Sequence, residues 1–215
     1  PVISILGDNF IDESLLKLLS NDGELKLIPE VVIEHIQTRG KFNIREDPDN
    51  FDYVYELSDI AILAGKKFKK KRNKANSVLK TLSDRLTTKK TSIIDIKTKI
   101  QLEKIIDKWA RNSKQTDEEL KLENKAIDNL FESASQLNLL VTIMAIDNEP
   151  VAFSINEILD SQYAICHFEK AIPVHEQIYT VIAKQAAQDL REMGCTYVNW
   201  EQDLGLAGLR KSKRA

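Results

Sequence analysis

Three carboxylates near the ends of predicted strands are the side chains best suited to chemistry in this chain of 215 residues. Glu169 ends a strand predicted over residues 162–169, and Glu201 and Asp203 follow the next predicted strand. A carboxylate at the opening of a cleft can take a proton from an attacking amine or hydroxyl, or orient that group. The alternatives are structural: Glu169 as a surface carboxylate paired with the neighbouring lysine, and Asp203 as a turn or helix cap.

A strongly basic helix is the second candidate feature. Seven of the nine positions from Lys66 to Lys74 are basic, although the formal net charge of the chain is −2. On a helical wheel Arg72 falls inside the apolar stripe that contains Phe68, and Lys71 flanks that stripe. Because an unpaired buried guanidinium is costly, we expect Arg72 to contact one of the three carboxylates named above or an anionic ligand.

Two interpretations of the basic helix stay open. Lys67, Lys71 and Arg72 can line a groove for a polyanion such as tRNA phosphates, a lipid phosphate or a nucleotide, and Arg210 is a further candidate for anion binding. Alternatively, the outward lysines form a solvated face and Arg72 makes a structural ion pair. A cleft that encloses Arg72 with Glu169 favours an enzyme, whereas an open face of lysines favours a binding module.

Metal binding and covalent catalysis are not indicated by the remaining reactive side chains. The three histidines, His35, His167 and His175, have no metal-ligand spacing. Cys166 lies inside a predicted strand, where a cysteine is more often part of the core than a nucleophile, and Cys195 is distant in sequence. We therefore expect no metal, and no cofactor is specified.

The composition, 42% hydrophobic and 30% charged with 7 Gly and 5 Pro, excludes collagen-like and disordered classes. No apolar run approaches the roughly 20 residues that a membrane-spanning helix needs, and the first residues do not resemble a signal peptide. We therefore expect a cytoplasmic protein with reduced thiols. Because the chain begins with Pro1 and stops within a helical pattern, we expect it to be a fragment of a longer protein.

The chain as a whole predicts an α/β fold, because strands and helices are interspersed. Before residue 84, the patterns predict strands over 1–6 and 25–28, helices over 12–19 and 30–37, a hairpin of 41–45 with 51–57, and one long helix over 58–83. After it they predict strands over 92–96, 139–146, 151–159, 162–169 and 196–200, and helices over 98–109, 116–136, 174–193 and from 206. The second series has the layout of an N-acetyltransferase (GNAT) domain.

Three stretches resemble the phosphatidylglycerol lysyltransferase C-terminal-like family: FDYVYELSDIAILAGKKFKKKRNKAN (51–76), CHFEKA (166–171) and NWEQDLGLAGLRKSKRA (199–215). The resemblance implies a tandem GNAT fold related to the Fem peptidyltransferases, which take amino acids from aminoacyl-tRNA. It thus implies acyl or aminoacyl transfer to an amine or hydroxyl, with aminoacyl-tRNA as a donor. We expect part of a GNAT-like unit over 1–57, a linking helix over 58–83 and a C-terminal GNAT-like domain over 84–215.

One departure from GNAT enzymes concerns the donor. Enzymes of that fold hold the pyrophosphate of acyl-CoA in a Gly-rich turn whose free N–H groups and helix dipole bind the anion. Here the turn over residues 172–179 contains no glycine, Pro173 removes an N–H donor, and Glu176 adds an anion. Acyl-CoA is therefore disfavoured as the donor. Two alternatives follow: a degenerate transferase, or a non-catalytic module that binds a nucleic acid or anionic lipid through residues 66–74.

Overall fold

The computed structural model describes residues 25–35, 42–159, 162–175 and 177–214. They form two compact units: one of residues 52–201, and a smaller one of residues 25–51 and 202–214 within the described ranges. Across these residues, no helix combines the length and the apolar character that crossing a membrane requires.

The larger unit is built on one sheet of six strands in the order β1-β6-β5-β4-β3-β2. β5 and β6 are parallel, and every other neighbouring pair is antiparallel. The strands are β1 (Val54–Glu56), β2 (Leu86–Thr91), β3 (Leu139–Ile146), β4 (Glu149–Ile158), β5 (Tyr163–Ala171) and β6 (Tyr197–Asn199). The mixed α/β class is therefore confirmed, and so is the predicted antiparallel meander of β3, β4 and β5.

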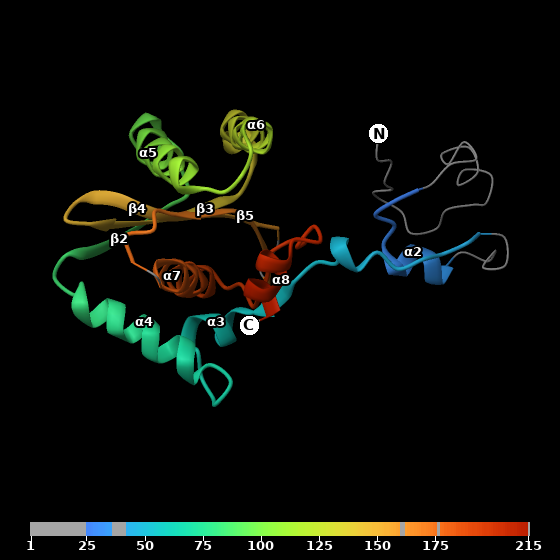
Figure 1. The fold of residues 1–215 in the computed structure, drawn as a ribbon, viewed down its shortest axis with the longest axis horizontal. Coiled ribbons are helices and arrows are strands. Elements are labelled where there is room, and N and C mark those ends of the chain that lie inside the picture. The colour runs from blue at the N-terminus through green and yellow to red at the C-terminus, as the bar shows by residue number, and fades with distance from the viewer. Residues whose placement is uncertain (1–24, 36–41, 160–161, 176, 215) are drawn as a thin grey trace. The chain divides into compact units, whose positions relative to one another are not determined.

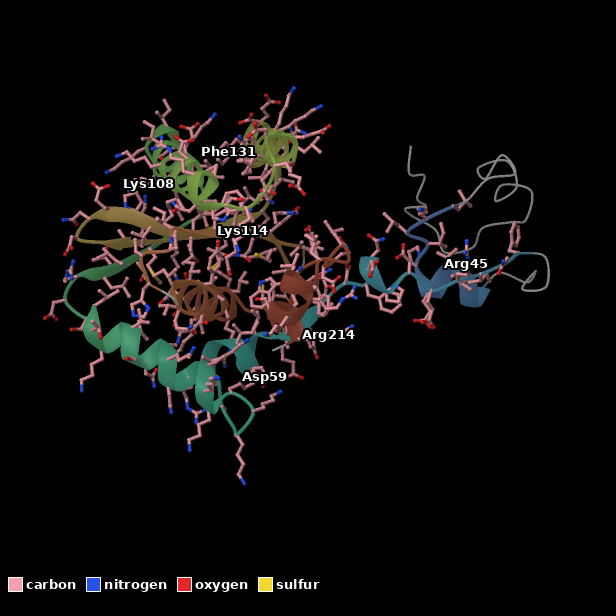
Figure 2. All side chains as sticks on the ribbon, viewed as in Figure 1. Arg45, Asp59, Lys108, Lys114, Phe131 and Arg214 are labelled. Carbon is pink, nitrogen blue, oxygen red and sulfur yellow. The ribbon has the colours of Figure 1, made fainter. Side chains whose placement is uncertain are left out.

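Helices cover both faces of this sheet (Figure 1). On one face lie α5 (Ile96–Asn112) and α6 (Asp117–Ser133), with the short helix η2 (Ala134–Gln136) after them. On the other face α7 (Ile178–Glu192) packs against the sheet, and α3 (Leu57–Ile62) and α4 (Lys69–Thr81) pack against α7. Figure 2 labels Phe131 on the α5–α6 side and Asp59 on the opposite side.

Side chains alternate along the central strands, so each strand contributes to the core on both faces of the sheet. Phe153 and Ile155 of β4 point into the core beneath α5 and α6, and both are fully buried. Ala152 of β4 and Ala171 of β5 belong to the core beneath α7. Because both faces are covered, β3 has only one polar residue, Thr142, and β4 is buried along most of its length although it carries Ser154 and Asn156.

The start of α6 is capped as the sequence predicts. The Thr116 backbone N–H donates to Glu119 Oε2 at 2.7 Å, and the Glu119 N–H donates to Thr116 Oγ1 at 3.3 Å. This capping box satisfies two of the N–H groups that the first turn of a helix leaves without intrahelical partners.

The single helix predicted over residues 58–83 is wrong, because the structure has two helices there. α3 ends at Ile62, Leu63 takes a left-handed conformation with a φ of 53°, and α4 begins at Lys69. The intervening turn includes Gly65, whose φ of 77° is easily reached only by a residue without a side chain. The break lets Leu63 and the half-buried Phe68 both pack against the core beneath α7.

The predicted hairpin of residues 41–45 with 51–57 is also wrong. Residues 42–47 are not in a strand, Pro48–Asn50 form the short helix η1, and β1 pairs with β6 through Val54 and Asn199. The backbone groups of β1 are thus satisfied by a strand more than a hundred residues away. Local turn residues suggested the hairpin, but the distant partner determines the pairing.

Several smaller differences occur at element ends. The strand predicted over 92–96 lies at 86–91 as β2, while Asp95 caps α5 by accepting from the Thr98 N–H at 2.7 Å. Residues 25–28 form no strand; α2 (Glu30–His35) and α8 (Ala207–Arg214) lie within predicted helices. The strand predicted over 1–6 and the helix over 12–19 fall outside the described residues. The predicted division into GNAT-like units stays a prediction.

Candidate active site

β5 and β6 separate soon after they pair. Only Tyr163, Ala164 and Ile165 of β5 are paired with β6, whereas β4 stays paired with β5 as far as Ala171. In the part of the chain that the structure describes, the edge of β5 over residues 166–171 therefore has no strand beside it. We call residues 166–171 together with 199–201, where β6 ends, the β5–β6 split.

A β-bulge determines which side chains face each layer at the split. Asn156 pairs with Cys166 and Ile155 pairs with Phe168, so His167 is an extra residue in β5. The bulge shifts the alternation by one, which places Glu169 opposite Ser154 on the α7 side of the sheet. Without it, Glu169 would lie beneath α5 and α6.

Glu169 has the properties of a strong base that is shielded from solvent. Its Oε2 atom is shut off from solvent and has no hydrogen-bond partner, although the residue as a whole is only partly buried. Burial raises the pKa of its carboxyl to about 8, because the charged form loses its hydration. An ionised carboxylate with this pKa accepts a proton far more readily than an ordinary one, and such shifts are typical of functional sites.

His167 lies between two carboxylates. Its Nε2 is 2.8 Å from Glu157 Oε2, and its Nδ1 is 3.8 Å from Glu201 Oε1. The pKa of His167 is raised by Glu201 and by Glu157, and burial opposes them. We regard the shorter contact, to Glu157, as the one that fixes the ring. His167 was not among the residues predicted to act in the site, because the spacing of the three histidines bears only on metal binding. Its position two residues before Glu169 was the signal in the sequence.

A cluster of four side chains fixes the end of β5. The Lys170 ammonium is ion-paired with Glu123 of α6 and lies 3.8 Å from the centroid of the Trp109 ring of α5. The pKa of Tyr179, at the start of α7, is raised mainly by burial, while hydrogen bonds with the Ala171 backbone and the Trp109 side chain lower it. Lys170 is thus paired with α6 and not with Glu169.

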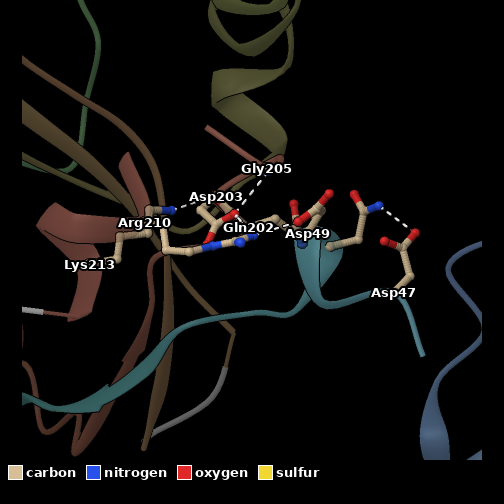
Figure 3. Close-up of polar contacts among 8 residues, drawn as sticks. Asp47, Asp49, Gln202, Asp203, Gly205, Arg210 and Lys213 are labelled. Atoms are coloured by element: carbon tan, nitrogen blue, oxygen red, sulfur yellow. Dashed lines mark hydrogen bonds and ion pairs between the residues drawn. The ribbon is translucent and has the colours of Figure 1, made fainter. Parts of the chain in front are cut away.

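Asp203 and Arg210 lie in the smaller unit and bind each other (Figure 3). Arg210 donates to both carboxylate oxygens of the fully buried Asp203, each at 2.7 Å, and to Asp49 Oδ1 at 2.5 Å. The Gly205 N–H also donates to Asp203 Oδ1, at 2.9 Å. The bonds of Arg210 tie α8 to η1, and the bond from the Gly205 N–H makes Asp203 a turn residue, which was one of its structural alternatives.

Arg72 does not have the carboxylate partner that the sequence analysis predicted. Its guanidinium donates to the backbone carbonyl of Leu63 and, at 3.2 Å, to that of Gly65. The reason is the break between α3 and α4: the end of a helix leaves carbonyls without partners, and a cation there is favourable. The prediction that Arg72 contacts Glu169, Glu201 or Asp203 is wrong.

The two lysines predicted to bind anions have different surroundings. Lys67 is exposed, forms an ion pair of 2.8 Å with Asp59, and lies 4.6 Å from the centroid of the Phe68 ring. Lys71 is half-buried, and burial lowers its pKa. Of the other lysines between residues 66 and 74, Lys66, Lys69 and Lys70 are exposed and Lys74 is partly buried.

Four N–H groups of the turn between β5 and α7 are used within the protein. Ile172 donates to the Val151 carbonyl at 2.8 Å, Val174 to Ile172 at 2.7 Å, and Gln177 and Ile178 to His175 at 3.3 and 3.1 Å, while Pro173 has no N–H. A pyrophosphate site needs several free N–H groups pointing at the anion, and these four are already bonded.

The hollows found on the described surface lie elsewhere. One of about 440 Å³ is lined by α6 alone, through Asp117, Leu120, Lys121, Asn124, Lys125 and Asp128. Another of about 320 Å³ is lined by Ser58, Arg191, Cys195 and Thr196. Neither contains Glu169 or His167. A hollow on one helix offers no convergent set of groups, so the β5–β6 split is the better candidate.

Comparison with known proteins identifies the family. The model of the family "phosphatidylglycerol lysyltransferase, C-terminal" matches residues 25–215. The chain belongs to this family. Its resemblance to that family, inferred from three stretches of sequence, is therefore confirmed, and a transferase-like role is supported. The comparison with curated proteins gave no match.

Solved structures show the same fold. A conserved protein of unknown function from Bacteroides thetaiotaomicron is 30% identical over 79% of this chain and 56% of its own, with a TM-score of 0.66. The C-terminal domain of a proposed lysylphosphatidylglycerol synthetase from Agrobacterium fabrum is 14% identical over 88% and 58%, with a TM-score of 0.59. L-PGS from Bacillus licheniformis is 16% identical over 74% and 49%, with a TM-score of 0.52. The chain thus spans about half of the structures that it matches.

Proposed function

We propose that the protein transfers an aminoacyl group from an ester donor to a hydroxyl or amine acceptor, and that the β5–β6 split is its active site. The observation that carries the proposal is Glu169, a carboxyl with a solvent-excluded, unpartnered oxygen on a stretch of β5 that has no strand beside it among the described residues. In a family of lysyltransferases, a base at this position suits removal of the acceptor's proton.

Glu169 would act on the acceptor. As the acceptor oxygen or nitrogen attacks the ester carbonyl, its proton passes to the Glu169 carboxylate, and the carbonyl oxygen takes the negative charge. No covalent enzyme intermediate is needed, so catalysis rests on positioning and on electrostatic stabilisation of the tetrahedral intermediate. A carboxyl with a pKa of about 8 is roughly one-tenth ionised at pH 7, and each ionised molecule is a strong base.

For the donor, we propose aminoacyl-tRNA. The family description, the four bonded N–H groups of the turn between β5 and α7, and the exposed lysines at 66, 69 and 70 all support a polyanionic donor other than acyl-CoA. Lysines on an open helix bind phosphates without reading sequence, and that binding weakens with salt. Glu201 would have a supporting role through His167, while Asp203 and Arg210 would maintain the fold of the smaller unit.

The test uses the full-length protein with lysyl-tRNA carrying radiolabelled lysine and vesicles that contain phosphatidylglycerol. Label that moves into the lipid fraction measures transfer. We expect Glu169→Gln to lower the rate by about 10²–10⁴-fold, the usual contribution of a general base. The matched control is Glu149→Gln, because Glu149 is an exposed glutamate on the same sheet. Equal rates for both variants would refute the assignment of Glu169, and no transfer by the wild type would favour a degenerate transferase or a binding module.

A further inference from the structure

We propose that His167 is the acid partner of Glu169, donating the proton that the leaving oxygen of the donor ester requires. The proposal rests on the proposed transfer function and adds a second catalytic residue to it. It follows from the hydrogen-bond chemistry of the imidazole ring, the position of the bulge and the open edge of β5.

The contacts of His167 favour its protonated form. A neutral imidazole has one N–H donor and one nitrogen lone pair, so one of its nitrogens would face a carboxylate with no hydrogen between them. Here Nε2 faces Glu157 at 2.8 Å and Nδ1 faces Glu201 at 3.8 Å. Both nitrogens can donate only in the imidazolium. The ring therefore carries a proton that it can give away while Glu157 and Glu201 hold its orientation.

Glu201 is itself held in place. Its backbone N–H donates to Asn199 Oδ1 at 2.7 Å, and Asn199 Nδ2 donates to Asp52 at 2.8 Å. Its carbonyl accepts from the Tyr53 N–H at 3.1 Å. Glu201 also has a positive φ of 53°, an uncommon conformation for glutamate. Backbone in such a conformation persists when the surrounding contacts enforce it, and these contacts place the carboxylate beside His167.

The bulge puts the proposed acid and base on opposite sides of the same strand edge. Glu157 follows Phe153 and Ile155 on the face of β4 that α5 and α6 cover, and His167 contacts Glu157 on that face. Glu169 is on the α7 side. Residues two apart in a strand have Cα atoms about 6–7 Å apart. A carbonyl group in the β5–β6 split would thus have His167 on one side and Glu169 on the other.

The proton transfers balance. The acceptor oxygen or nitrogen forms a bond to the carbonyl carbon and loses its proton to Glu169. The tetrahedral intermediate collapses, the bond from that carbon to the leaving oxygen breaks, and this oxygen takes the proton of His167. One proton then passes, through solvent, from Glu169 to His167 to restore the starting state. No oxidant, metal or further reactant is required.

The experiment compares two lysyl esters whose leaving groups differ in their need for an acid, and each donor is compared between the variant and the wild type. Lysyl-tRNA leaves as a ribose hydroxyl, which needs a proton; lysine p-nitrophenyl ester releases a phenolate, which leaves without one. We expect His167→Gln in the full-length protein to slow transfer from lysyl-tRNA by about 10²–10⁴-fold but transfer from the nitrophenyl ester by less than about tenfold. Gln can still donate to Glu157 but has no proton to transfer. Equal loss with both donors, or no loss with either, would overturn the proposal.

A second variant gives a result even if His167→Gln fails to fold. Glu157→Gln removes one of the two carboxylates that raise the pKa of His167, whose other charged neighbour is Glu201. The limb of the rate profile with lysyl-tRNA that reports His167 should therefore move to lower pH in this variant, while the limb due to Glu169 stays in place. A profile in which neither limb moves to lower pH would exclude His167 as the acid. If Glu169→Gln abolishes transfer from both donors but the histidine tests fail, the transfer function stands and this inference alone is wrong.

Discussion

Replacing Glu169 by glutamine should stabilise the protein, and more so at higher pH. The folded state keeps the proton of Glu169 up to a pKa of about 8, whereas the unfolded chain loses it near the ordinary glutamate pKa of 4.5. Between these values the unfolded state binds fewer protons, so the free energy of unfolding of the wild type falls as the pH rises. At 1.36 kcal/mol for each pKa unit, the loss reaches about 5 kcal/mol once the carboxyl is fully ionised. It amounts to about 1 kcal/mol at pH 5 and about 3 kcal/mol at pH 7.

Urea denaturation of the wild type and Glu169→Gln at pH 5, 6, 7 and 8 measures this difference directly. Glutamine has nearly the same size and cannot ionise, so its stability lacks the contribution of this group. The advantage of the variant should grow with pH by the amounts given above. Glu149→Gln, at an exposed carboxylate, should show a difference that hardly changes with pH. Parallel pH curves for the wild type and Glu169→Gln would show that the carboxyl is well solvated or paired, and would remove the basis for its role as a base.

Three further outcomes can be checked. Arg72→Met should lower the free energy of unfolding by about 1–2 kcal/mol, because two backbone carbonyls lose their donor. The control Lys70→Met, in the same helix, should change the free energy of unfolding by less than about 0.5 kcal/mol. Equal urea midpoints for the two variants would contradict this role of Arg72. Thr116→Ala should cost about 1 kcal/mol through loss of the capping box, measured in the same way, and an unchanged midpoint would show that the box contributes little. Acetyl-CoA should give no heat of binding in calorimetry with the full-length protein, since Pro173 has no N–H and four other N–H groups of the turn are already bonded. Tight binding would contradict the proposal that acyl-CoA is not the donor.

Elements with a strong local signal could be predicted from the sequence. β3 has a single polar residue, β4 contains the apolar run 150–153, and α6 opens with a capping box between Thr116 and Glu119, so pattern alone gives their type and approximate bounds. Short, polar or distant pairings could not be predicted. β2 has exposed side chains along most of its length, and β1 has a partner more than a hundred residues away. Their strand state depends on hydrogen bonds that no local pattern encodes.

The sequence by itself determined the α/β class, the family resemblance, the absence of glycine from the turn at 172–179 and the choice of Glu169 as a candidate. Tertiary structure decided how these residues act. One extra residue in β5, His167, reverses the side of the sheet on which Glu169 lies, because side chains alternate along a strand. The left-handed turn at Leu63 gives Arg72 backbone carbonyls as partners in place of a carboxylate. The pKa of Glu169 depends on burial, and burial is a property of the packed layers, which bring together segments that are far apart in the chain.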